Sequence, residues 1–170
     1  MAEGSGTTIR VPVPADDGAG TEIEAYLYRP ARSAANAPLA ICLHGMNESG
    51  LRTAPVARRL AQAGFVALAP TLRCGGGQAA GPTTSLSPLT QLADVAALRA
   101  AATGWIGVDT SRTVLFGRSQ GGLIAVLAAA QHPAGVAALA LWYPALRAPE
   151  NVRARFGTRA AVPESFTSRV

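Results

Sequence analysis

The stretch Gly117-Arg118-Ser119-Gln120-Gly121-Gly122 follows a short apolar run, residues 113–116, and opens an alanine-rich segment. This order predicts a strand, then a sharp turn that carries Ser119, then a helix. Gly117 and Gly121 suit such a turn, because a Cβ atom at either position would collide with the neighbouring strand or helix. Ser119 then stands at a helix N-terminus, where backbone N–H groups favour developing negative charge. In this context the pattern Gly-x-Ser-x-Gly predicts a nucleophile elbow.

A second apolar run, residues 38–43, ends in the polar sequence His44-Gly45-Met46-Asn47-Glu48-Ser49-Gly50. A continuous apolar run of this length predicts a buried strand, and the loop after it is the expected source of an oxyanion-hole N–H in this architecture. We therefore expect the backbone N–H groups of Met46 and Gln120 to form an oxyanion hole beside Ser119. The residues expected to support these two loops are His44, Gly45, Gly117 and Gly121.

Together these segments resemble the α/β-hydrolase family, and within it the branch of esterases, dienelactone hydrolases and serine-peptidase-like proteins. The resemblance extends from about residue 7 to about residue 166. It implies an α/β-hydrolase fold, in which residues 1–144 form the N-terminal part of the core and residues 145–170 begin a cap or insertion. It also implies a serine hydrolase that acts on a small-molecule carboxylic ester through a Ser119 acyl-enzyme, with no metal and no organic cofactor.

Family members carry the catalytic acid and then the histidine after the nucleophile. After Ser119 the sequence has one histidine, His132, and two acidic residues, Glu150 and Glu164. His132 follows Ser119 by 13 positions on one predicted helix, which places it roughly 20 Å away. We therefore expect the chain to stop before the triad acid, the base and the last strands of the sheet, and to be inactive or only partly active.

Three other titratable residues have alternative interpretations. His44 leads the loop beside the elbow and is kept as an alternative base, although a loop-shaping role is favoured. Asp94 lies on a predicted amphipathic helix and is expected to be solvated or to act as a cap. Asp109 precedes the elbow strand and is expected to form a turn at the opposite end of the sheet.

The remaining pattern alternates strands with helices, which predicts a mostly parallel sheet covered on both faces. The expected strands are residues 7–14, 21–28, 38–43, 65–69, 113–116 and 136–142, and the expected helices are residues 55–63, 86–102 and 120–131. Asp16-Asp17-Gly18 is the expected turn between the first two strands. The alternation in residues 21–28 is typical of a half-exposed edge strand, and residues 136–142 form an apolar edge that invites self-association.

Composition narrows the class of protein. A length of 170 residues suits one domain. No apolar run approaches the roughly 18 residues of a membrane span, and the N-terminus has no secretory pattern, which together predict a cytoplasmic protein without membrane contact. Cys42 and Cys74 provide neither a disulfide framework nor a metal pair. The glycines at 75–77 lack the residues of a phosphate loop, so a flexible loop is expected there.

The net charge of +5 raises the question of nucleic-acid binding. All fifteen basic residues are arginine, and 5% aromatic residues offer few stacking surfaces. We therefore expect no nucleic-acid partner. Two alternatives to an enzyme stay open. One is a non-catalytic binding module in which Ser119 is only a fold element. The other is a protein that pairs its 136–142 edge with another chain.

Overall fold

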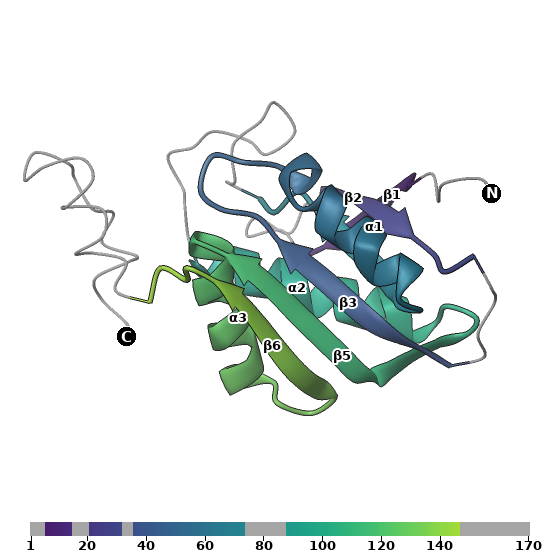
Figure 1. Ribbon diagram of the computed structural model, residues 1–170. Helices are drawn as coiled ribbons and strands as arrows, with labels where there is room; N and C mark the ends of the chain where they lie inside the picture. The colour runs from purple at the N-terminus through teal and green to yellow at the C-terminus, as the bar shows by residue number, and fades with distance from the viewer. Residues whose placement is uncertain (1–5, 15–20, 32–35, 74–87, 147–170) are drawn as a thin grey trace, which may run out of the picture.

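The computed structural model describes residues 6–14, 21–31, 36–73 and 88–146. The elements in these ranges are β1 (Thr7–Val13), β2 (Thr21–Tyr28), β3 (Ala37–Leu43), the 3-10 helix η1 (Gly50–Arg52), α1 (Ala54–Gln62), β4 (Val66–Pro70), α2 (Pro88–Thr103), β5 (Val108–Arg118), α3 (Gln120–Gln131) and β6 (Val136–Trp142). The strands form one sheet in the order β1-β2-β4-β3-β5-β6 (Figure 1).

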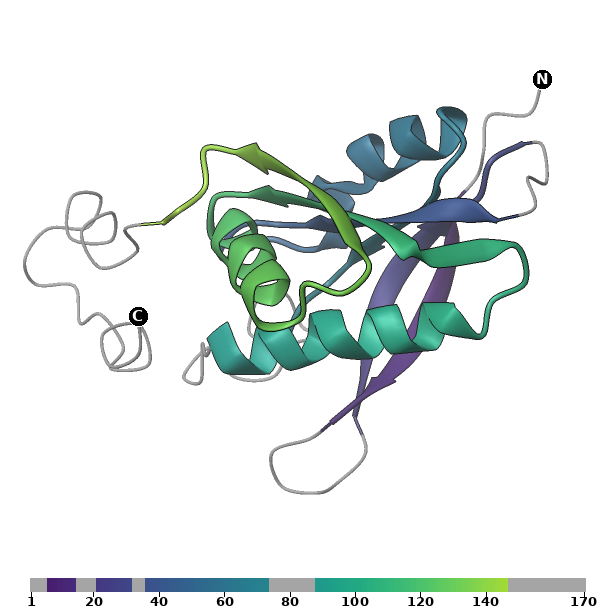
Figure 2. The ribbon, with the colours of Figure 1, turned by 90° about the horizontal axis from the view of Figure 1, so that it is seen from below.

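The sheet is mixed but mostly parallel. The strands β4, β3, β5 and β6 are parallel, whereas β2 is antiparallel to both β1 and β4. Helix α1 lies on one face of the sheet, and α2 and α3 lie on the other (Figure 2). The predicted α/β architecture, with helices on both faces, is therefore confirmed. Since parallel strands end at the same edge, the segments after β3 and β5 come together there.

Side chains of different size pack the two faces of the sheet. The core under α2 and α3 contains large aliphatic side chains, among them Leu39, Ile41, Leu43, Leu98, Leu115 and Ile124. The core under α1 contains small side chains, among them Ala40, Cys42, Ala57, Ala61, Ala67 and Ala69. Burial of a leucine or isoleucine side chain contributes about 1.5–3 kcal/mol. The α2 and α3 face therefore supplies the larger share of the hydrophobic stabilisation.

Strand β6 has the bounds that the apolar run predicts, and it forms an edge of the sheet. Its apolar side chains are exposed on both faces: Leu139 and Leu141 are each 39% exposed, and Trp142 is 55% exposed. An apolar edge strand with unpaired backbone groups is a template for pairing with another strand.

The interpretation of residues 21–28 as an edge strand is wrong. β2 pairs with β1 on one side and with β4 on the other, and the edge is β1. The half-exposed pattern has a different cause, because Tyr26 and Tyr28 lie over the small-residue core beside α1 and are only partly covered by it. Alternation in a sequence reports which faces are covered and does not report whether the backbone is paired.

Strand β5 begins earlier than the apolar run predicts. Its register with β3 shifts between two neighbouring residues of β3: Pro38 pairs with Asp109, and Leu39 pairs with Thr113. The intervening residues form a bulge, in which a carboxylate oxygen of Asp109 accepts a hydrogen bond of 3.0 Å from the Ser111 N–H. Asp109 thus has the turn-forming contact expected for it, at the amino end of β5 and away from Ser119.

Several interpretations fall outside the part of the chain that the structure describes. They concern the turn at residues 16–18, Cys74, the glycines at 75–77, the start of the helix expected from residue 86, and residues 147–170 of the expected insertion.

The expectation that Asp94 is solvated or a cap is wrong. Asp94 is fully buried in α2, and its carboxylate accepts hydrogen bonds from the backbone N–H of Arg73 at 2.8 Å and from its Nε at 2.7 Å. The Arg73 side chain is 13% exposed. The periodicity of a helix does not reveal a partner that comes from a loop 21 residues earlier. Asp94 therefore fixes the chain that follows β4.

We predict that Asp94→Asn lowers the free energy of unfolding by about 3 kcal/mol, because it leaves the Arg73 guanidinium largely buried beside a neutral group. Asp109→Asn is the matched control. It also removes a carboxylate that binds a backbone N–H and an arginine, but in an exposed pair with Arg112, so it should lower stability much less than Asp94→Asn. Urea titration of both variants measures the difference. Equal costs would contradict the structural role of Asp94.

Candidate active site

Ser119 occupies a strained turn between β5 and α3. Its backbone has φ 52° and ψ −120°, in the left-handed range of φ that non-glycine residues rarely adopt. The surrounding glycines permit this turn. A Cβ atom on Gly117 would lie 2.3 Å from the Gly121 carbonyl oxygen, and one on Gly121 would lie 2.4 Å from that of Leu43. Only glycine at both positions lets α3 begin this close to the ends of β3 and β5.

The loop after β3 lies directly against Ser119. A Cβ atom built on Gly45 would be 3.4 Å from the Ser119 Cβ. The Ser119 backbone is held in turn by the segment after β6, since its N–H donates to the Trp142 carbonyl at 3.1 Å and its carbonyl accepts from the Ala145 N–H at 2.9 Å. Three strand ends therefore enclose the serine.

The two expected oxyanion donors are the backbone N–H groups of Met46 and Gln120, and neither is bound to another group of the protein that the structure describes. The Gly45 N–H donates to Oε2 of Glu48 at 2.8 Å, so it is not free for a ligand. Among the described residues, the N–H groups of Met46 and Gln120 have no hydrogen-bond acceptor. Gln120 is the first residue of α3, where backbone N–H groups lack intrahelical partners. Both donors are thus available at the end of the sheet that holds Ser119.

Both ring nitrogens of His44 are already engaged. Nε2 accepts a hydrogen bond of 3.0 Å from the Leu72 N–H, so the proton lies on Nδ1, which donates to the Gly45 carbonyl at 2.7 Å. Burial lowers the pKa of His44, against the opposing effects of the Gly45 carbonyl and the Glu48 carboxylate. The imidazole is therefore neutral and has no free nitrogen to accept a proton from Ser119. These contacts fit the loop-shaping role expected for His44.

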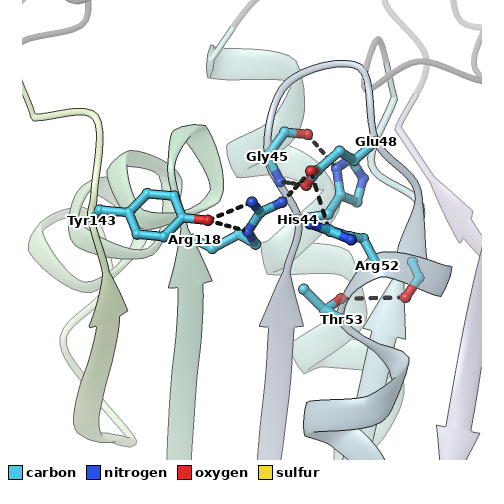
Figure 3. Close-up of polar contacts among 8 residues, drawn as sticks. His44, Gly45, Glu48, Arg52, Thr53, Arg118 and Tyr143 are labelled. Atoms are coloured by element: carbon cyan, nitrogen blue, oxygen red, sulfur yellow. Dashed lines mark hydrogen bonds and ion pairs between the residues drawn. The ribbon is translucent and has the colours of Figure 1, made fainter.

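An ionic network ties the loop to the elbow (Figure 3). Glu48 accepts a hydrogen bond from Nη1 of Arg118, the residue before Ser119, and lies 3.5 Å from Nε of Arg52. Arg118 also donates from Nε to the Tyr143 hydroxyl at 2.9 Å. Burial disfavours the charged Glu48 carboxylate, but the contacts with Arg118 and Gly45 outweigh it and lower its pKa. Sequence reasoning missed this network, because the two motifs do not show that Glu48 in the loop pairs with Arg118 in the elbow.

Two buried side-chain amides, Gln120 and Gln91, connect the residue after Ser119 to α2. Nε2 of Gln120 donates to Oε1 of Gln91 at 2.8 Å, and Nε2 of Gln91 donates to the Arg73 carbonyl at 2.9 Å. The second bond fixes the orientation of the Gln91 amide and therefore that of Gln120. The first residue of α3 is thus joined to α2 and to the chain that follows β4.

The other titratable candidates lie away from Ser119. His132 caps the far end of α3, where its carbonyl accepts a hydrogen bond from Arg99. A pocket of about 430 Å³ opens at that end of the molecule and is lined by Arg99, His132 and Thr110 among others. It contains no residue of the elbow or of the loop after β3, so it is not the site predicted by the motif.

Within the described ranges, no group of three or more His, Cys, Asp or Glu side chains is placed to hold a metal ion. Across the same ranges, no helix combines the length and the hydropathy needed to cross a bilayer.

Comparison with known proteins identifies the family and the fold. The family model described as serine aminopeptidase, S33 matches residues 35–167. No curated protein matches the chain. An α/β hydrolase from Novosphingobium aromaticivorans DSM 12444 is 30% identical, with a TM-score of 0.61, over 83% of this chain and 44% of its own. Est1E from Butyrivibrio proteoclasticus, with ferulic acid bound, is 27% identical, with a TM-score of 0.71, over 84% of this chain and 56% of its own.

A bacterial heroin esterase shares the fold at 23% identity, with a TM-score of 0.64, over 85% of this chain and 46% of its own. The chain thus spans about half the length of these solved structures.

The lowered pKa of His44 predicts a pH dependence of stability. Below about pH 6.5 the unfolded chain takes up a proton at this position while the folded chain does not. The free energy of unfolding therefore decreases as the pH is lowered, until the pKa of His44 in the folded chain is reached. We expect urea midpoints to fall between about pH 7 and about pH 5.5, and His44→Gln to reduce that fall. The exposed His132 provides the matched control, and His132→Gln should leave the fall of the urea midpoint as it is in the wild type. An unchanged slope in His44→Gln would contradict the burial of a neutral imidazole.

Proposed function

Because the chain belongs to the α/β-hydrolase family described as serine aminopeptidase, S33, we propose that it supplies the nucleophile and oxyanion loop of a serine hydrolase that acts on carboxylic esters. The observation that carries this proposal is the strained backbone of Ser119, held beside Gly45 by glycine contacts. Strain of this kind costs about 1–3 kcal/mol and persists where the surrounding structure imposes it.

The proposed reaction begins with attack of Ser119 Oγ on the ester carbonyl carbon. The carbonyl oxygen becomes negative in the tetrahedral intermediate and is stabilised by the N–H groups of Met46 and Gln120, at about 3 kcal/mol per well-placed donor. The serine proton passes through a base to the departing alkoxide, which leaves as the alcohol. Water then hydrolyses the acyl-serine, which releases the carboxylic acid and restores Ser119.

The base and its acid come, in this proposal, from polypeptide other than the described residues. His44 has both nitrogens engaged, and His132 lies at the far end of α3. A serine hydroxyl without a base is a weak nucleophile. The described residues therefore supply two of the parts of a hydrolytic site, the nucleophile and the oxyanion donors.

Esters are favoured over peptides as the substrate class. Est1E, at 27% identity, was solved with ferulic acid, a small carboxylic acid, whereas the family description names an aminopeptidase. Ferulic acid is not an amino acid, so it fits the acyl product of an ester more closely than the product of an aminopeptidase. Peptides and amides remain the alternative substrate class.

The proposal predicts that the purified 170-residue chain hydrolyses p-nitrophenyl acetate only at background. A chimera that carries the C-terminal segment of Est1E after Phe166 should gain at least about 1000-fold, because the grafted histidine activates Ser119. Two controls complete the test: the chimera with Ser119→Ala, and the chimera without the grafted histidine. Both should return to background in a steady-state assay.

Equal rates in all three chimeras would reject the enzyme and favour the non-catalytic binding module. Robust turnover by the chain itself, lost in Ser119→Ala, would instead show that a base lies within these 170 residues. His44→Ala would then be the next variant to assay.

A second candidate function follows from the exposed edge. We infer that β6 pairs with a strand of another polypeptide, because its backbone edge and both its faces are accessible. A second copy of the chain is the simplest such partner. Pairing would extend the sheet and cover Leu139, Leu141 and Trp142.

This candidate predicts a mass above the 17.3 kDa of a single chain in sedimentation equilibrium. Leu139→Lys should shift the chain toward the monomer, because a charge on an edge strand opposes pairing. Ile106 is 93% exposed and lies outside β6, so Ile106→Lys is the control and should leave the mass unchanged. A wild-type monomer at all concentrations would reject self-association.

A further inference from the structure

Glu48 contacts Gly45, another residue of the loop after β3, at two points. Its Oε2 accepts the Gly45 N–H at 2.8 Å, and its own backbone N–H donates to the Gly45 carbonyl at 3.3 Å. The same carbonyl accepts Nδ1 of His44 at 2.7 Å. Both backbone polar groups of Gly45 are therefore fixed by neighbours.

Fixing Gly45 also fixes the direction of the Met46 N–H. The peptide bond between the two residues is trans, since the described residues contain no cis peptide. In a trans peptide the carbonyl and the N–H point in opposite directions. Because the Gly45 carbonyl is held toward His44 and the Glu48 backbone, the Met46 N–H must point away from both. Its orientation is therefore set by His44 and Glu48.

The same carboxylate reaches the elbow. Its Oε1 accepts a hydrogen bond from Arg118, the residue before Ser119. Arg118 is held in place on its other side, where its guanidinium lies 5.8 Å from the ring centre of Trp142 and 5.3 Å from that of Tyr143. Figure 3 shows the guanidinium between Glu48 and Tyr143. One carboxylate thus joins the loop, the elbow and the segment after β6.

We propose that Glu48 is a positioning residue of the oxyanion hole, which orients the Met46 N–H through Gly45 and sets its distance from Ser119 through Arg118. This inference rests on the proposed function. It goes further by assigning a role to a loop residue for which the sequence predicts none. The chemistry requires a carboxylate, because Gly45 donates to Oε2 and Arg118 donates to Oε1, so both atoms must be acceptors.

Glu48→Gln tests the role with almost no change in shape. An amide has one oxygen and one NH₂ group, so it can satisfy Gly45 or Arg118 but not both. The matched control is Asp109→Asn, which removes a carboxylate with the same two kinds of partner at the other end of β5. Any general effect of losing a surface carboxylate should appear in both variants.

The first measurement uses the full chain and needs no activity. Hydrogen exchange followed by mass spectrometry should show exchange about 10-fold faster in Glu48→Gln, both in peptides that cover residues 44–49 and in those that cover 118–122. Peptides from β3 should be unchanged, which shows that the variant is folded. Asp109→Asn should match the wild type in all three regions. Wild-type exchange in the loop or the elbow of Glu48→Gln would overturn the proposal.

The second measurement uses the active chimera described above. Glu48→Gln should lower kcat about 10-fold and leave KM within about 2-fold, because a misdirected donor weakens binding of the transition state and not of the ester. Equal loss in Asp109→Asn, or a change confined to KM, would overturn the positioning role. If the chimera is inactive with Ser119 present, the proposed function fails, and the exchange measurement alone decides the structural role of Glu48.

Discussion

The contact between the start of α3 and the end of β3 is the constraint on which the rest of the site depends. Gly121 lies so close to the Leu43 and His44 carbonyls that a Cβ atom would come within 2.4 and 2.5 Å of them. This distance forces the chain to turn at one residue, and that residue is Ser119. The loop that begins at His44 consequently starts beside Ser119.

Much of the fold follows from local sequence, because buried parallel strands are short continuous apolar runs and β6 is such a run without interruption. The elbow was predictable for the same reason, since its glycines and serine are close in sequence. Contacts that join distant segments were not predictable. Glu48 and Arg118 are 70 positions apart, and Arg73 and Asp94 are 21 apart. A charge pattern shows that a partner is needed, but only the packing of strands selects which one.

The polar groups around Ser119 form two systems of opposite character. His44 is buried, neutral and bound through both nitrogens. Glu48 and Arg118 form an ion pair that is only partly buried, with exposed side-chain fractions of 25% and 13%. The neutral group holds the loop to the chain after β4, and the charged pair holds it to the elbow. The loop is therefore fixed from both sides by interactions that differ in their sensitivity to salt and to pH.

The unequal cores on the two faces of the sheet imply two different ways in which the fold fails. Under α1 the contact is made by alanines such as Ala57 and Ala67, both fully buried, so the helix lies close and has no room for a larger residue. Under α2 and α3 the contact is made by residues such as Leu98 and Ile124, where a smaller residue leaves a cavity. One face is thus damaged by overfilling and the other by emptying. Substitutions that enlarge a side chain are therefore harmful under α1, and substitutions that shorten one are harmful under α2 and α3.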